Sequence, residues 1–309
     1  MSPHAPPLRG SPPNEAVRFT VGRPGGETLS DSGAMCLIAF AIEADPARPL
    51  LLAANRDEFF DRPTEPLHRW ALPDGTGVVA GRDLRDGGTW LGVSEGGRVA
   101  MLTNVRSANP GPGRRSRGEL TTRWLQSGSS WDALLSGVAA TDYGGFNLVV
   151  GDLATGFWAW VSNRNPARPH AEQADGLHHR RLTAGVYGLS NAALDTPWPK
   201  TLRLKRSLDQ ALAAGLNDPA PLVAALADRD TRPESELPDT GVPAELERAL
   251  SSPFVDMADR GYGTRSSLLL NVVRHGGDWS ADFTEWTHKP PAAGPHRWTD
   301  AEPHRLQLS

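Results

Sequence analysis

The sequence predicts an α+β protein in which sheets pack together and helices lie outside them. Short apolar runs of strand length are bounded by Gly and Pro, and they come in blocks separated by helical segments. A parallel βαβ protein would instead alternate single strands with single helices. The chain has 309 residues, 39% of them hydrophobic, which is enough to bury a full core.

The expected elements follow from these patterns in chain order. Strands are expected at 36–43, 50–55, 78–81, 89–93, 98–103, 146–151, 157–162, 186–189, 266–273 and 279–286. Ser116 and Glu119 have the spacing of a capping box at a helix start, and further helices are expected from Ser130 and over 199–214, 219–228 and 244–251. An irregular loop is expected from Arg62 onward, because Pro63 breaks the pattern.

The two ends of the chain differ in composition from its middle. Residues 1–34 are rich in Pro and Gly and poor in aliphatic residues, so we expect a disordered or non-native N-terminal extension. Met35 is then the expected initiator, and its removal would expose the α-amine of Cys36. A single domain is expected over 35–290 and a flexible C-terminal tail over 291–309.

The bulk composition narrows the class of partner. A net charge of −4 without a basic block argues against nucleic acid, and no apolar run reaches the length of a membrane-spanning helix. We therefore expect a cytoplasmic protein without membrane insertion, whose partner is a small-molecule ligand or substrate. The single cysteine excludes an internal disulfide and every multi-cysteine metal site, so no metal is expected.

Cys36 has two interpretations. A lone cysteine on an apolar strand is commonly a buried small hydrophobic residue. A cysteine that follows a methionine at a strand start can instead be an N-terminal nucleophile, whose own α-amine is the general base.

Polar residues gather at other strand ends. Arg56, Asp57 and Glu58 can simply form a solvated turn at a strand end. Alternatively, Arg56 lowers the pKa of a thiol or holds a substrate carboxylate, while Asp57 or Glu58 orients the α-amine or the arginine. Three asparagines at or near strand ends, Asn104, Asn147 and Asn191, offer amide donors for an oxyanion, although turn capping explains each equally well.

Several motifs together resemble the NRDE family, named for Asn-Arg-Asp-Glu, whose animal members are called transport and Golgi organisation protein 2. The matching motifs are Met35–Leu37, Ala54–Phe59, Gly81–Leu84, Gly87–Gly92, Leu102–Asn104, Ser116–Leu120, Gly145–Leu148, Gly188–Asn191, Leu194–Lys200, Leu237–Gly241 and Tyr262–Ser267. The resemblance implies a four-layer αββα sandwich of mainly antiparallel sheets, similar to N-terminal-nucleophile hydrolases such as the penicillin and bile-salt amidases.

That similarity also implies a site. Cys36 would be the nucleophile, Asn104 and Asn191 the oxyanion donors, and Arg265 a late substrate-binding arginine. The remaining residues expected to bind substrate are Asn55, Arg56, Asp57, Glu58 and Asn147. The second-strand Arg–Asp pair of those amidases fits poorly, because Glu58 matches the aspartate only if Asn55 stands at the arginine position. Alternatively, Arg56 supplies the charge from a neighbouring position, which on a strand points to the other face.

Three functions remain open. The first is a cysteine N-terminal-nucleophile hydrolase of a linear non-peptide amide, which needs no cofactor. The second is a non-enzymatic carrier or chaperone of haem or another small hydrophobic acid, suggested by ten tryptophans and by the family's association with haem mobilisation. The third is an interaction protein with a degenerate site.

Overall fold

The computed structural model describes residues 35–108, 113–171, 174–216, 218–288 and 302–309. The expected extension 1–34 and the first part of the expected tail lie outside these described residues. The strands are β1 (Met35–Asp45), β2 (Arg48–Phe59), β3 (Thr64–Ala71), β4 (Gly77–Asp83), β5 (Leu91–Ser94), β6 (Arg98–Asn104), β7 (Phe146–Asp152), β8 (Phe157–Ser162), β9 (His178–Arg181), β10 (Gly185–Leu189), β11 (Asp256–Met257), β12 (Tyr262–His275), β13 (Asp278–Thr287) and β14 (Pro303–Leu308). The helices are α1 (Gly118–Leu125), α2 (Trp131–Ser136), α3 (Pro199–Ala213), α4 (Ala220–Leu226) and α5 (Ala244–Ala249), with 3-10 turns at Ala140–Asp142, Glu234–Glu236 and Ala258–Arg260.

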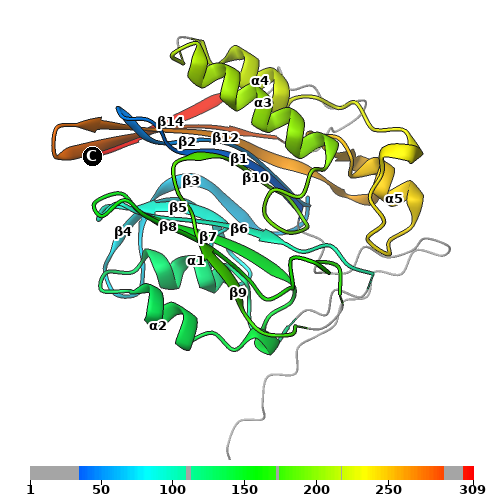
Figure 1. Cartoon of the computed structure of the whole chain (residues 1–309), viewed down its shortest axis with the longest axis horizontal. Helices are drawn as coiled ribbons and strands as arrows, with labels where there is room; N and C mark the ends of the chain where they lie inside the picture. Colours follow the sequence, from blue (N-terminus) through cyan, green and yellow to red (C-terminus); the bar gives the residue numbers. More distant parts are fainter. Residues whose placement is uncertain (1–34, 109–112, 172–173, 217, 289–301) are drawn as a thin grey trace, which may run out of the picture.

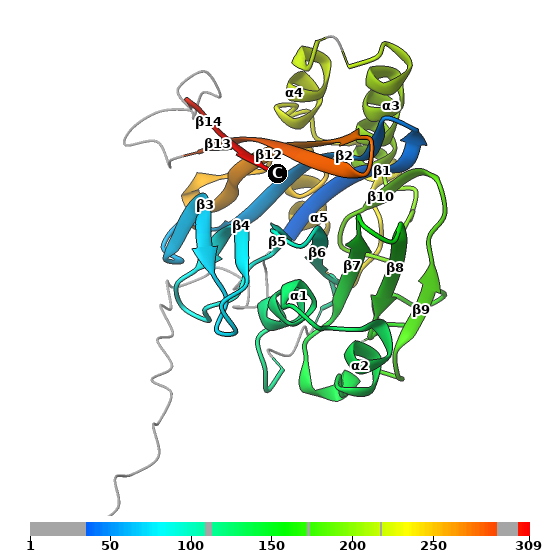
Figure 2. The same cartoon turned by 90° about the vertical axis from the view of Figure 1, so that its left-hand side faces the viewer.

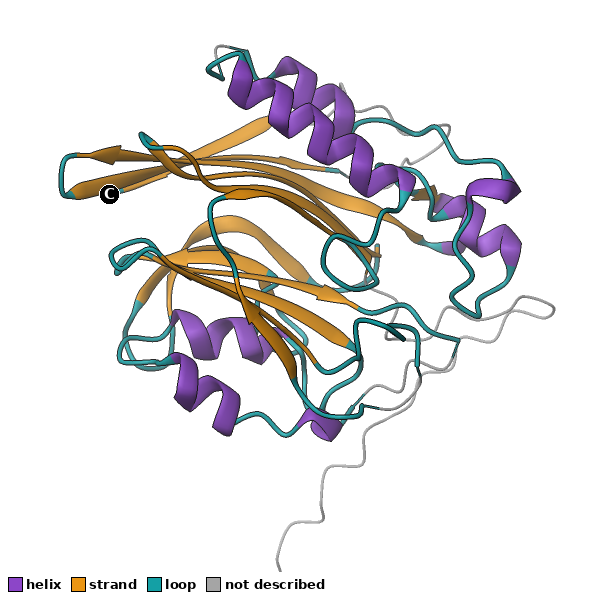
Figure 3. Ribbon diagram, viewed as in Figure 1, coloured by secondary structure: helices purple, strands orange, loops and turns teal. Residues whose placement is uncertain are grey.

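Two seven-stranded antiparallel sheets stack face to face, and helices cover the outer face of each (Figure 1). The first sheet has the order β10-β1-β2-β12-β13-β14, with β11 paired to β12, and the second runs β3-β4-β5-β6-β7-β8-β9. Helices α3 and α4 lie over the first sheet, and α1 and α2 lie over the second (Figures 2 and 3). This confirms the α+β class and the expected αββα sandwich.

Alternation along β1 explains how the layers are held together. Ile38, Phe40 and Ile42 point into the core between the two sheets. Leu37 and Ala39, on the opposite face, pack against the helices. Side chains alternate between the two faces of a strand, and both faces of β1 are covered. The sequence of β1 is therefore one continuous apolar run. A separate apolar cluster joins the second sheet to α1 and α2.

Four strands form where the sequence predicted none: β3, β9 and β14 lie at sheet edges, and the two-residue β11 pairs with β12. Thr64–Ala71 was expected to be an irregular loop but forms β3, with Pro66 inside a register shift that edge strands tolerate. His178–Arg181 forms β9 without any apolar residue. The expected flexible tail 291–309 is wrong for Pro303–Leu308, which pairs with β13 as β14.

The helices begin and end close to the expected residues. Ser130 caps α2 by accepting a hydrogen bond from the Ala133 N–H, as its position before an apolar run predicts. The expected capping box at α1 does not form, because Arg117 is the residue before the helix and makes no side-chain cap. Within the described ranges, no helix combines the length and apolarity needed to cross a membrane.

Candidate functional site

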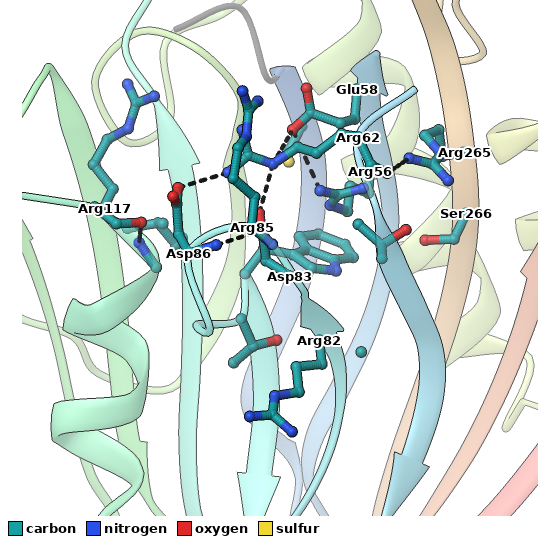
Figure 4. Close-up of a pocket in the computed structure, with 18 of the residues that line it drawn as sticks. Arg56, Glu58, Arg62, Arg82, Asp83, Arg85, Asp86, Arg117, Arg265 and Ser266 are labelled. Carbon is teal, nitrogen blue, oxygen red and sulfur yellow. Dashed lines mark hydrogen bonds and ion pairs between the residues drawn. The ribbon is translucent and has the colours of Figure 1, made fainter. Parts of the chain in front are cut away.

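A cavity of ≈ 410 Å³ opens between the two sheets, at the edge where β1 begins and β2 ends (Figure 4). Its wall includes Cys36, Trp90, Leu102 and Asn104. Most of the remaining lining is charged. The arginines are Arg56, Arg62, Arg82, Arg85, Arg114, Arg115, Arg117 and Arg265, and the carboxylates are Glu58, Glu65, Asp83, Asp86 and Glu285. Eight arginines against five carboxylates give the lining a formal excess of positive charge.

Cys36 forms part of the wall of this cavity. It pairs with Arg56 across β1 and β2, and its backbone carbonyl accepts a 3.0 Å hydrogen bond from the Ser190 hydroxyl. The residue is 4% exposed. Burial, together with the negative charges of Asp57 and Glu58, raises the pKa of the Cys36 thiol to about 12. While Met35 remains attached, the thiol is therefore neutral at physiological pH.

The Asn-Arg-Asp-Glu run divides its side chains between two faces of β2. Arg56 and Glu58 line the cavity, and their side chains lie 3.3 Å apart. Asn55 does not line it: its amide donates to the carbonyls of Leu226 (2.9 Å) and Pro253 (2.8 Å). Asp57 also lies outside the cavity and accepts a 2.6 Å hydrogen bond from the Thr264 hydroxyl. Asn55 and Asp57 thus contact protein groups outside the cavity, and their expected role in substrate binding stays a prediction.

The asparagines separate in the same way. Asn104 lines the cavity. Asn191 is fully buried behind it, and its amide donates to the Asn104 carbonyl at 2.9 Å. Asn147 donates to the Ala192 carbonyl at 2.7 Å and accepts from the Trp160 indole at 3.2 Å. The structure therefore places Asn104 in the cavity wall, Asn191 as its support and Asn147 away from the site.

The cavity arginines are held mainly by protein groups. Arg62 pairs with Asp83 at 2.6 Å and Asp86 at 2.7 Å, and its Nε lies 3.6 Å from Glu58. Arg265 donates to the backbone carbonyls of Phe59 (3.1 Å) and Arg62 (2.5 Å), so it fixes the turn between β2 and β3. Sequence reasoning assigned no role to Arg62, although the carboxylate Asp83 lies in one of the matching motifs.

The peptide bond between Met35 and Cys36 lies among buried polar groups on the helix side of β1. The Met35 N–H donates to the Tyr262 hydroxyl at 3.0 Å, and Arg106 Nε lies 3.3 Å from the Met35 sulfur. The ammonium of Lys200, only 2% exposed, donates to the Leu250 carbonyl at 2.8 Å. Burial lowers the pKa of Lys200 and raises that of Asp57. Sequence reasoning gave a role only to Asp57: Lys200 and Tyr262 lie in matching motifs without an assigned role, and Arg106 lies in none.

Sequence comparison finds close relatives. A family model described as transport and Golgi organisation 2 matches residues 35–290. A transport and Golgi organization protein 2 homolog from Bos taurus is 34% identical over 292 residues, which cover 88% of this chain and 100% of that protein. The homolog from Homo sapiens is 34% identical over 81% of this chain and 92% of its own length. The Drosophila melanogaster protein is 25% identical over 77% and 88%, respectively.

Structure comparison finds more distant similarity. A mutant conjugated bile acid hydrolase from Clostridium perfringens has a TM-score of 0.43 and 12% identity, covering 80% of this chain and 91% of that one. A Caenorhabditis elegans ortholog of N-acylethanolamine-hydrolyzing acid amidase has a TM-score of 0.41 and 11% identity, covering 76% and 92%. Similarity at this level carries no argument about chemistry. The sequence matches, by contrast, are decisive: the chain belongs to the transport and Golgi organisation 2 family.

Proposed function

We propose that this chain, in a form that begins at Cys36, hydrolyses a linear, non-peptide amide that carries an acidic group. The observation that supports this most is the position of the chain's one thiol. It lies in the wall of a ≈ 410 Å³ cavity, one peptide bond from a methionine. Removal of Met35 would give Cys36 a free α-amine, which is the base that an N-terminal nucleophile uses.

The proposed reaction has two steps. In the first, the α-amine takes the thiol proton, and the sulfur attacks the amide carbon to form a C–S bond. The C–N bond then breaks, and the proton moves from the ammonium to the leaving nitrogen, which departs as an amine. In the second, the free α-amine takes a proton from water, whose oxygen attacks the thioester and releases a carboxylic acid and the thiol.

The residues around Cys36 have distinct proposed roles. Asn104, which lines the cavity, is the candidate donor to the oxyanion, and Asn191 positions it through its carbonyl. A new ammonium beside the thiol would also lower the thiol pKa, because a positive charge favours the thiolate. The arginine excess of the lining supports an acidic substrate.

A comparison of two chains tests the proposal. One begins at Met35, which cellular processing can remove, and the other is the full chain from Met1, in which the Cys36 nitrogen stays in a peptide bond. Intact-mass analysis first establishes each N-terminus. We expect a panel of acid-bearing amides to form a thioester adduct only on the chain that begins at Cys36, and Cys36→Ala to abolish the adduct. Equal turnover by both chains would refute the mechanism.

A second candidate is a carrier that binds a small organic acid without turnover. The neutral, buried thiol of the Met35-containing form favours it, because that form has no activated nucleophile. Haem fits poorly: no histidine lines the cavity among the described residues, and a neutral thiol is a weak iron ligand. The cavity arginines could bind the carboxylates of haem, but they could equally bind those of any other organic acid. Haem titration that gives no saturable Soret shift would exclude haem as the cargo.

A further inference from the structure

We infer that Arg117 is the binding site for the acidic group of the ligand, a carboxylate or a phosphate. This inference rests on the proposed function, because it names the residue that binds the acidic group of the substrate in the same cavity. It changes the assignment of the anion site, because sequence reasoning gave that role to Arg56 and Arg265.

The two arginines expected to bind the acid already have partners. Arg56 lies 3.3 Å from Glu58, and Arg265 donates to two backbone carbonyls of the β2–β3 turn. The charge of Arg56 is therefore offset by a carboxylate, and Arg265 is fixed in place by the two carbonyls that its Nη1 reaches. Both arginines therefore hold protein groups together.

The neighbouring cavity arginines are engaged as well. Arg62 bridges Asp83 and Asp86. Arg115 pairs with Glu119 at 2.8 Å, and Arg114 pairs with Asp142 on the surface. Arg82 lies over the Trp70 ring, 4.8 Å from its centroid. These contacts hold most of the positive charge of the lining in place.

Arg117 differs from these arginines in two ways. Within the described part of the chain it has no ion pair, unlike Arg56 and Arg62, and it is half-buried, unlike the exposed Arg82. The Nη1 of Arg117 donates one long hydrogen bond, 3.4 Å, to the Gly145 carbonyl. Among the described residues, no carboxylate lies within 4.0 Å of its guanidinium. A guanidinium has five N–H donors, so most of its donor capacity remains for a ligand. Loss of water around it lowers the pKa of Arg117 to about 10, which leaves it charged at neutral pH. A half-buried cation with spare donors is a strong anion site, because bidentate pairing with carboxylate or phosphate is favourable there.

The backbone beside Arg117 is held firmly, so the site is preorganised. Gly118 packs so closely on Gly88 that a Cβ on Gly88 would lie 2.5 Å from the Gly118 carbonyl carbon. One turn later, the Thr121 hydroxyl donates to the Thr89 carbonyl at 2.6 Å. Figure 4 shows Arg117 on the wall that faces Glu58 and Arg62 across the cavity. A ligand bound by Arg117 therefore shares the cavity with Cys36.

Binding, measured without hydrolysis, tests the inference. The full chain is titrated by calorimetry with benzoate, phenyl phosphate and uncharged benzamide, none of which is an acid-bearing amide. We expect at least one anion to bind and benzamide to bind at least ten-fold more weakly. Tighter binding of phenyl phosphate would identify a phosphate-bearing ligand, and tighter binding of benzoate a carboxylate.

Variants make the test specific. Arg117→Gln should weaken anion binding at least ten-fold, and Arg117→Lys should recover part of it. The matched control is Arg123→Gln, on the helix that follows Arg117, which also donates to a backbone carbonyl (Gly137, 2.9 Å) but lies outside the cavity. Circular dichroism checks that each variant is folded.

Two outcomes would overturn the inference. They are unchanged anion affinity in a folded Arg117→Gln, and failure of the wild-type chain to prefer either anion over benzamide. Cys36→Ala separates this inference from the proposed function, because it removes the nucleophile and should leave anion affinity unchanged. Anion binding without any turnover would thus support Arg117 as the anion site and contradict the proposed hydrolase activity.

Discussion

At the scale of single residues, the chemistry of Cys36 depends on what precedes it. With a thiol pKa of about 12, the Met35-containing chain has about one thiolate in ten thousand molecules at pH 8. We expect iodoacetamide to label it roughly a thousand-fold more slowly than free cysteine, and the rate to rise about ten-fold per pH unit above pH 7. Mass spectrometry measures the adduct, and Cys36→Ala is the blank. A plateau below pH 9 would contradict the prediction.

Asp57 gives a second prediction at this scale. Burial, the largest cause, raises the pKa of Asp57 to about 6 from the usual 3.8, so the native state holds a proton that the unfolded chain releases. Stability should therefore fall as pH rises through this window. Asp57→Asn should flatten the fall in melting temperature between pH 4 and pH 6.5. The control Asp74→Asn, whose carboxyl has its pKa lowered by backbone donors, should keep the fall.

The divided faces of β2 show why the site was only partly predictable. The sequence placed Asn55, Arg56, Asp57 and Glu58 together at a strand end, and strand alternation requires that half of them point away from the cavity. Which half faces the cavity depends on register with β1, where Cys36 pairs with Arg56. Register is set by tertiary packing, so the four adjacent polar residues did not show which of them face the cavity.

At the scale of elements, the contact between Gly88 and Gly118 holds the start of α1 against the β4–β5 loop. Gly88→Ala should place a methyl group 2.5 Å from the Gly118 backbone, so the helix must shift. We expect a loss of about 1–3 kcal/mol in the free energy of unfolding. Urea denaturation measures it. Gly96→Ala is the control, because its nearest atom would be 3.9 Å away, and an equal loss there would exclude the contact as the cause.

The sequence predicted the central strands, but it did not predict three of the edge strands. Strands in the middle of the sheets are buried on both faces and read as apolar runs, as β1 does. β3, β9 and β14 are edge strands, and β9 consists of His and Arg alone. Charged and Pro-containing edges oppose sheet-to-sheet aggregation, and the same composition removes the hydrophobic signal from which strands are predicted.

At the scale of the whole molecule, the last strand closes one edge of the first sheet. Leu308 is 3% exposed and packs into the core between the sheets, whereas its neighbour Gln307 is exposed. Leu308→Ala should lower the free energy of unfolding by about 2–4 kcal/mol, and Gln307→Ala should change it by less than about 0.5 kcal/mol. Thermal or urea unfolding checks both. Equal small effects would show that β14 does not secure the sheet.

The enclosure of the single thiol also bears on oxidation. Oxidants attack thiolates that solvent can reach, and the Met35-containing chain offers a neutral sulfur on a residue that is 4% exposed. That form should resist peroxide and should form no intermolecular disulfide. A chain that begins at Cys36 would have a more reactive thiol and would lose this protection from oxidation. Sensitivity to peroxide would then distinguish the two forms in a mixed sample.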